Sequence, residues 1–298
     1  MDCRVRTHRF MMLYCGLYHS KIYLRSNASM LELYHFNNSV CSQKARMTLF
    51  EKGLDWRSHE VNLFISEQYD PKYLKLNPKG YVPALIHDGK AIRESTLICE
   101  YLDDIFPLPP LMPNGAAERV QVRLWSKTVD EGLFEGVTVF SFSAMFRDRM
   151  KKLSVEGRER RYRNVGDQVR RDRHNSVFEH GVDSPYVSRA VATYEIAFKA
   201  MEETLVGGSN WLVDDMFSLA EVNLAPFIAR LEYLTLLDLW IDERPAIGSW
   251  WQRVKDRSSY QAEISDPLTS EEIEEMEVSG ARIKPRVEEM RAEYLAWA

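Results

Sequence analysis

The chain has 298 residues, enough to bury a sizeable core in one large or two ordinary domains. It is 45% hydrophobic and 28% charged, a composition typical of globular proteins, and its net charge of −5 argues against a general nucleic-acid binder. Four cysteines without CxxC or zinc spacing favour a reducing compartment. With no histidine cluster and no long apolar run, we expect a cytoplasmic protein without a metal site or a membrane partner.

The first 29 residues differ from the rest of the chain. Basic residues precede a short apolar stretch, Phe10 to Tyr18, which superficially resembles a signal peptide. The stretch contains two tyrosines, and no small-residue cleavage pattern follows it. We therefore interpret 1–29 as an upstream extension, such as a misplaced start would produce, and expect it to be poorly ordered.

A strand, a polar turn and a helix are predicted for the segment 31–51. Its first six residues form a short, largely apolar run with two aromatic residues, Tyr34 and Phe36. The next three are typical of turns and helix caps, and an apolar stripe then runs to a helix end before Gly53. Ser39 and Cys41 therefore lie at a helix N-terminus, where backbone N–H groups and the helix dipole stabilise an anion. The alternative is that Ser39 only caps the helix and Cys41 only packs.

After Gly53 the sequence predicts a second strand, then a tight turn that ends at Gly80, then a strand that begins with Pro83. If the Val82–Pro83 bond is cis, the Val82 backbone turns outward, where it can pair with the peptide groups of a ligand. Another helix is predicted from Glu94 to Phe106. At its N-terminus, Ser95 can hold a carboxylate and Glu94 can receive an ammonium group. The alternative for this pair is simple helix capping.

Helical patterns dominate the rest of the chain after a proline-rich linker at 108–116. We expect the segment 117–298 to form a helical domain. It contains an insertion at 147–173 with eleven lysines and arginines against five acidic residues. Because the insertion contains a single aromatic residue, Tyr162, we interpret it as a solvated helix or a lid over a site, and the alternative is a nucleic-acid patch.

The order of these elements, with the phrases NPKGYVPAL and ESTLICEYL, resembles the N-terminal domain of glutathione transferases. The resemblance implies an α/β thioredoxin-like N-terminal domain at 30–107, followed by an all-α domain. It also implies that Val82, before Pro83, pairs with the cysteinyl part of glutathione, and that Glu94 and Ser95 hold its γ-glutamyl group. Glutathione is then the cofactor, and the partner is a second copy of the chain in a homodimer.

The resemblance leaves three candidates for the residue that meets the glutathione sulfur. Ser39 falls where serine-type classes place their activating hydroxyl. Cys41 falls near the beta-class cysteine, and its surroundings look like those of bacterial hydroquinone reductive dehalogenases, in which the cysteine forms a mixed disulfide with glutathione. Ser42 corresponds to a serine of the sphingomonad β-aryl etherases.

These observations predict an enzyme that activates the glutathione thiol for attack on a hydrophobic, aromatic electrophile. Cleavage of an aromatic ether is the favoured reaction. One alternative is a glutathione-dependent reductive dehalogenase that uses Cys41. Another, of a different class, is a dimeric binding module that has lost catalysis.

Overall fold

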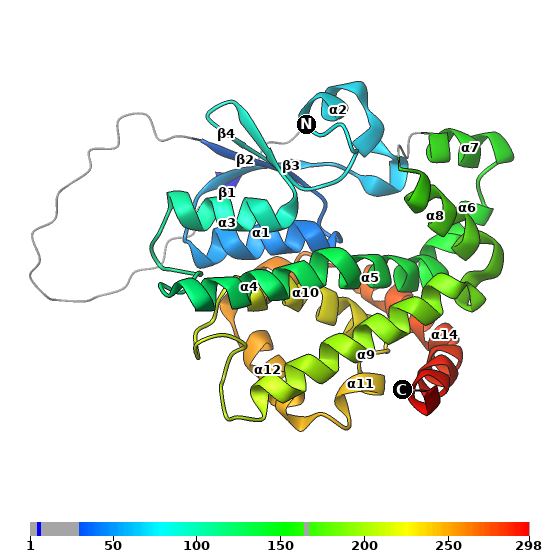
Figure 1. Cartoon of the computed structure of the whole chain (residues 1–298). Helices are drawn as coiled ribbons and strands as arrows, with labels where there is room; N and C mark the ends of the chain where they lie inside the picture. Colours follow the sequence, from blue (N-terminus) through cyan, green and yellow to red (C-terminus); the bar gives the residue numbers. More distant parts are fainter. Residues whose placement is uncertain (1–4, 7–29, 164–166, 298) are drawn as a thin grey trace, which may run out of the picture.

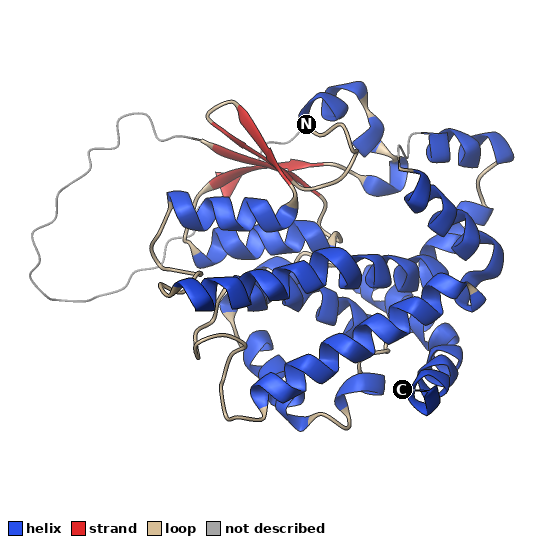
Figure 2. Cartoon of the chain, in the orientation of Figure 1, coloured by secondary structure: helices blue, strands red, loops and turns tan. Residues whose placement is uncertain are grey.

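The computed structural model describes residues 5–6, 30–163 and 167–297. A small sheet with helices against it comes first in the chain, and an assembly of helices follows (Figures 1 and 2). This is the predicted fold class, an α/β domain followed by an all-α domain. Within the described residues, no helix is both long and apolar enough to be a candidate for a membrane span.

The sheet has the strand order β1-β3-β2-β4-β5. β2 and β3 are parallel and are joined through helix α1, whereas the other neighbouring strands are antiparallel. Helices α1 and α3 lie side by side against one face of the sheet (Figure 1). The elements of this part are β1 (Val5–Arg6), β2 (Leu31–His35), α1 (Val40–Glu51), β3 (Trp56–Glu60), α2 (Pro71–Leu76), β4 (Ala84–His87), β5 (Lys90–Arg93) and α3 (Ser95–Ile105).

Two details of the sheet differ from the sequence-based expectation. Strand β1 comes from the segment 1–29 and pairs with the outer edge of β3, whose unpaired backbone groups can accept a short stretch of extended chain. Except for residues 5–6, that segment lies outside the described residues. Strand β4 begins only at Ala84 because Pro83 has no N–H to donate to the ladder. The Val82–Pro83 bond is cis, as predicted.

The helical part begins with a nearly continuous helical path through residues 116–151. The sequence predicts one helix over 117–137, but the structure contains π-helical turns at Val129–Leu133 and Phe142–Phe146. The α-helices of this part are α4 (Ala116–Thr128), α5 (Phe134–Ser141), α6 (Arg147–Lys151), α7 (Val155–Arg163), α8 (Gln168–His180), α9 (Pro185–Leu205), α10 (Leu219–Tyr233), α11 (Asp238–Ile241), α12 (Pro245–Lys255), α13 (Ser258–Tyr260) and α14 (Ser270–Trp297).

Helix α1 is buried almost all round rather than along one stripe. It packs against α3 on one side and against α10 on another, so it joins the sheet part to the helical part. Its apolar side chains contribute to both hydrophobic cores. The same packing buries Lys44, Arg46 and Lys52, which an amphipathic pattern would place on the surface. The N-terminus of α1 is therefore held by a rigid layer on each side.

Candidate functional site

Two adjoining cavities meet at the N-terminus of α1. The first, which we call the α3 cavity, has a volume of about 400 Å³ and the second, the aromatic cavity, about 320 Å³. Four residues line both cavities: Cys41, Tyr81, Val82 and Phe134. The remaining lining residues of the α3 cavity are Asn77, Pro83, Glu94, Ser95, Leu97 and Asp130. A ligand in one cavity can therefore contact a ligand in the other.

The loop before β4 is fixed by hydrogen bonds to one carbonyl. Tyr81 O accepts from the Tyr73 hydroxyl at 2.5 Å and from the Asn77 amide at 2.9 Å. Gly80 has φ +62°, and a Cβ there would lie 2.7 Å from the Tyr69 ring, so only glycine fits this turn. These contacts position the Val82 backbone at the wall shared by the two cavities.

The N-terminus of α3 combines a carboxylate, a hydroxyl and helix N–H groups. Glu94 is the N-cap residue, with φ 66°, but its side chain does not cap the helix and instead accepts from Lys79 Nζ at 2.7 Å. Ser95 is the first helical residue and is buried against the α3 cavity. The first N–H groups of a helix favour a bound anion, so this end suits a carboxylate beside Ser95.

Asp130 brings a second carboxylate to the α3 cavity, which sequence reasoning missed. It accepts from the Thr96 hydroxyl at 2.9 Å and lies 3.5 Å from Lys44 Nζ. The buried Lys44 ammonium in turn donates to the Thr96 hydroxyl at 2.6 Å. Asp130 lies in the π-helical turn at Val129–Leu133. It belongs to a phrase, Arg123 to Glu131, that resembles the β-aryl etherases, but the sequence assigned it no role in the site.

Cys41 lies in the first turn of α1, where the two cavities meet. Its side chain is half-buried and also packs against the helical core. Burial raises the pKa of the Cys41 thiol, and the Lys44 ammonium and the Ser95 hydroxyl oppose this shift without cancelling it. The thiol is therefore mostly protonated at neutral pH, which weakens it as a nucleophile.

Ser39 and Ser42 have different surroundings although they are three residues apart. Ser39 is the N-cap of α1, its Oγ accepts from Ser42 N at 3.3 Å, and it lines the aromatic cavity. Ser42 is fully buried, its Oγ accepts from Phe36 N at 3.3 Å, and it is not among the described residues that line either cavity. The structure brings Ser39 and Cys41 to a cavity wall and directs Ser42 into the interior.

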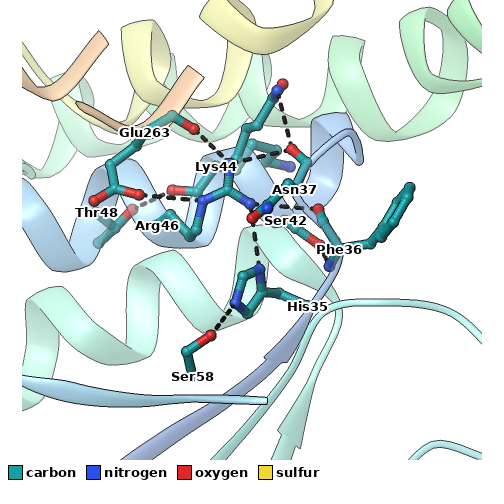
Figure 3. A network of polar contacts seen from close by, with 10 residues as sticks. His35, Phe36, Asn37, Ser42, Lys44, Arg46, Thr48, Ser58 and Glu263 are labelled. Atoms are coloured by element: carbon teal, nitrogen blue, oxygen red, sulfur yellow. Dashed lines mark hydrogen bonds and ion pairs between the residues drawn. The ribbon is translucent and has the colours of Figure 1, made fainter. Parts of the chain in front are cut away.

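Arg46 holds the turn that carries Ser39, a role that sequence reasoning also missed (Figure 3). Its guanidinium donates to Phe36 O at 3.3 Å and to Asn37 O at 3.2 Å. It also pairs with the buried Glu263 carboxylate at 3.1 Å and donates to the Glu263 carbonyl at 2.5 Å. A carboxylate from the far end of the chain therefore fixes the turn through one arginine, which no local pattern reveals.

The aromatic cavity has phenylalanine walls and a basic lining. Among the lining residues that the structure describes there are arginines and a histidine, but neither aspartate nor glutamate. Arg230 is buried next to Ser39: it donates to Asn38 O at 2.8 Å, and burial lowers its pKa to about 10. The aromatic and basic residues of the wall are Phe36, Phe64, Tyr81, Phe134, Phe142, Phe146, Arg149, Arg170, Arg173, His174 and Arg230.

Comparison with known proteins gives the family. Residues 33–110 match the glutathione S-transferase N-terminal domain and residues 174–257 match the C-terminal domain. Protein LigF of a Sphingobium species is 33% identical over 195 residues, which cover 64% of this chain and 75% of LigF. The chain belongs to the glutathione S-transferase family, and it is an enzyme whose co-substrate is glutathione.

Two further comparisons bear on the type of transferase. The crystal structure of the β-etherase LigF superimposes with a TM-score of 0.70 at 29% identity and covers 78% of this chain and 98% of LigF. The tetrachloro-p-hydroquinone reductive dehalogenase of Sphingobium chlorophenolicum is 25% identical over 242 residues, covering 78% of this chain and 94% of the dehalogenase. The predicted resemblance to both kinds of enzyme is thus confirmed.

Glutathione fits the α3 cavity by its chemistry. The molecule has an ammonium group, two carboxylates and two peptide units. The carboxylates of Glu94 and Asp130 suit the ammonium, Ser95 at the α3 N-terminus suits a carboxylate, and the Val82 backbone suits a peptide unit. Glutathione supplies a thiol, whose deprotonated form is a strong nucleophile.

Proposed function

We propose that this protein cleaves aromatic ethers with glutathione as the nucleophile. The observation that carries the proposal is the junction of the two cavities, at which Cys41, Tyr81 and Val82 face both. A cavity suited to glutathione thus lies directly beside one suited to an aromatic ring. The likeness to LigF, whose crystal structure is described as that of a β-etherase, selects the ether among aromatic electrophiles.

In this proposal Val82, Glu94 and Ser95, with Pro83 shaping the turn, hold glutathione, and Ser39 stabilises its sulfur anion. The Ser39 oxygen already accepts a hydrogen bond from Ser42 N, so its own hydrogen is available for the sulfur. A C–S bond forms as the C–O bond breaks, and the electron pair leaves with the aryl oxygen. The nearby Arg230 guanidinium stabilises the negative charge that develops there.

The test uses a β-aryl ether whose leaving phenol becomes fluorescent on release. The protein with glutathione should release phenol and glutathione thioether in equal amounts, measured by fluorescence and mass spectrometry. Release without glutathione, or none with it, contradicts ether cleavage. If calorimetry then also detects no binding of millimolar glutathione, the non-catalytic binding module is favoured instead.

A second candidate is reductive dehalogenation through Cys41. The observation that favours it is that Cys41, unlike Ser39, lines both cavities. In this reaction the glutathione thiolate first displaces halide from the arene, so that a C–S bond forms as the carbon–halogen bond breaks. The Cys41 thiolate then attacks the sulfur of this conjugate, the aryl carbon takes a proton, and a Cys41–glutathione disulfide forms. A second glutathione thiolate then reduces that disulfide and releases glutathione disulfide. Ser42, buried in the interior, is assigned a structural role in both reactions.

We also propose a homodimer formed through α3 and α4. Leu97 and Ile105 on α3, and Val120 and Leu124 on α4, are about half exposed or more. The Arg123–Glu100 ion pair joins the two helices, so these apolar side chains lie on neighbouring faces. A two-fold axis that sets α3 of one subunit against α4 of the other would bury both faces. Sedimentation velocity should give twice the monomer mass, and a monomer at micromolar concentration contradicts the proposal.

A further inference from the structure

Two arginines of α8 stand one helical turn apart in the wall of the aromatic cavity. Arg170 and Arg173 both line the cavity, as the spacing of three on one helix face allows. Arg170 lies with its guanidinium 4.1 Å from the centre of the Tyr81 ring, and Tyr81 lines both cavities. The two arginines therefore lie near the junction of the two cavities, where the reaction is proposed to occur.

Arg173 is almost completely buried and has hydrogen-bonding capacity left over. Its Nη1 pairs with Glu135 at 3.0 Å, but its Nε has no acceptor among the described residues. The buried Gln68, also in the wall of this cavity, likewise has a side-chain oxygen without a partner. A buried donor without an acceptor is costly, and a native structure normally fills such a place with a ligand or water.

Three of the four arginines that line the cavity have a carboxylate nearby. Glu135 pairs with Arg173, Glu275 pairs with Arg149, and the Glu272 carboxylate interacts electrostatically with Arg230. Among the described residues, no carboxylate lies within ion-pair distance of Arg170, and no carboxylate lines the cavity. A cavity with aromatic walls and excess guanidinium charge is matched by an aromatic ligand that carries a negative charge.

We infer that the aromatic substrate carries a carboxylate, which Arg170 and Arg173 bind. A carboxylate is planar, matches the guanidinium fork and is ionised at neutral pH, whereas a simple phenol, with a pKa near 10, is not. The choice of an aromatic substrate rests on the proposed function. Both arginines lie between the two matched family segments, in the basic insertion at 147–173.

The test measures binding without turnover, so that it can fail independently of ether cleavage. Calorimetry of the protein saturated with S-methylglutathione, which has no free thiol, compares 4-phenoxybenzoate with 4-phenoxybenzamide, two diaryl ethers of the same shape that differ in charge. The carboxylate should bind at least about tenfold more tightly, as expected for hydrogen bonds to charged groups. Equal affinity for the two probes overturns the inference, whether or not the protein cleaves ethers.

Variants then locate the preference. Arg170→Gln and Arg173→Gln should each lower the affinity for the carboxylate more than the affinity for the amide, and so reduce the preference for the carboxylate. Arg171→Gln is the matched control, because Arg171 donates to Gln168 and is not among the residues that line the cavity. Arg173→Gln could fail to fold because Glu135 loses its partner. In that case the measurement on Arg170→Gln, at a half-buried position, is sufficient for the test. A preference that persists in Arg170→Gln overturns the assignment.

Discussion

The two cavities are assembled in different ways. Most residues of the α3 cavity lie between Asn77 and Leu97, on the loop before β4 and at the N-terminal end of α3. The aromatic cavity takes its residues from segments spread between Phe36 and Arg230. A site formed by one continuous segment keeps its local backbone geometry whenever that segment folds. A site formed by many helix faces exists only once those helices have packed, so its specificity can change without loss of the first site.

The largest effect is expected where the two cavities meet. Ser39→Ala should lower kcat for the fluorogenic ether about 100-fold at saturating glutathione, because the sulfur anion loses a hydrogen-bond donor in a site with little water. Cys41→Ala, the comparison variant on the same helix turn, should lower kcat far less. The reverse order of the two effects would assign the reaction to Cys41 and favour the dehalogenase.

A smaller effect is expected from a change confined to the α3 cavity. Ser95→Ala should weaken glutathione binding about tenfold, as expected for one hydrogen bond to a charged group. Binding of 4-phenoxybenzoate to the glutathione-free protein should be unchanged, because Ser95 is not among the residues that line the aromatic cavity. Thr204→Ala removes a hydroxyl from an exposed face of α9 and serves as the control. Equal losses for both ligands would contradict the separation of the two cavities.

The smallest effect concerns the reactivity of the Cys41 thiol. Burial raises its pKa above the ordinary value, so the thiolate fraction at pH 7 is lower than in a free cysteine and increases as the pH rises. Alkylation by iodoacetamide, followed by mass spectrometry of the Cys41 peptide, should be slow at pH 7 and increase with pH. Fast alkylation at pH 7 would indicate a stabilised thiolate and support the Cys41 reaction.

The sequence could predict the elements that depend on neighbouring residues. The polar turn before α1 and the capping box of Ser218 and Glu221 at α10 depend on contacts within a few residues. The turn that ends at Gly80, before the cis Val82–Pro83 bond, has the same local origin. For that reason Ser39, Cys41, Val82, Glu94 and Ser95 could be singled out as candidates from the sequence.

The sequence could not show which of its polar residues become buried. A helix of alternating basic and apolar residues predicts a surface helix, yet α1 lies between two layers, and Arg46 finds its carboxylate on Glu263 near the other end of the chain. Asp130 and Arg230 likewise reach the site from helical segments of the C-terminal part, where the sequence assigned neither of them a role in the site. Contacts between residues so far apart in the chain cannot be predicted from the spacing of residues in the sequence.

The sequence by itself determined the order of the elements, the proline turn before β4 and the positions of the helix N-termini at Ser39 and Ser95. These follow from turn chemistry and hydrophobic periodicity, which are short-range. The tertiary structure alone decided that Ser42 points inward, that Cys41 faces two cavities, and that Arg170 and Arg173 of the basic insertion line the aromatic cavity. The physical reason is that burial and charge pairing depend on which helix faces meet, and that is settled by packing over the whole molecule.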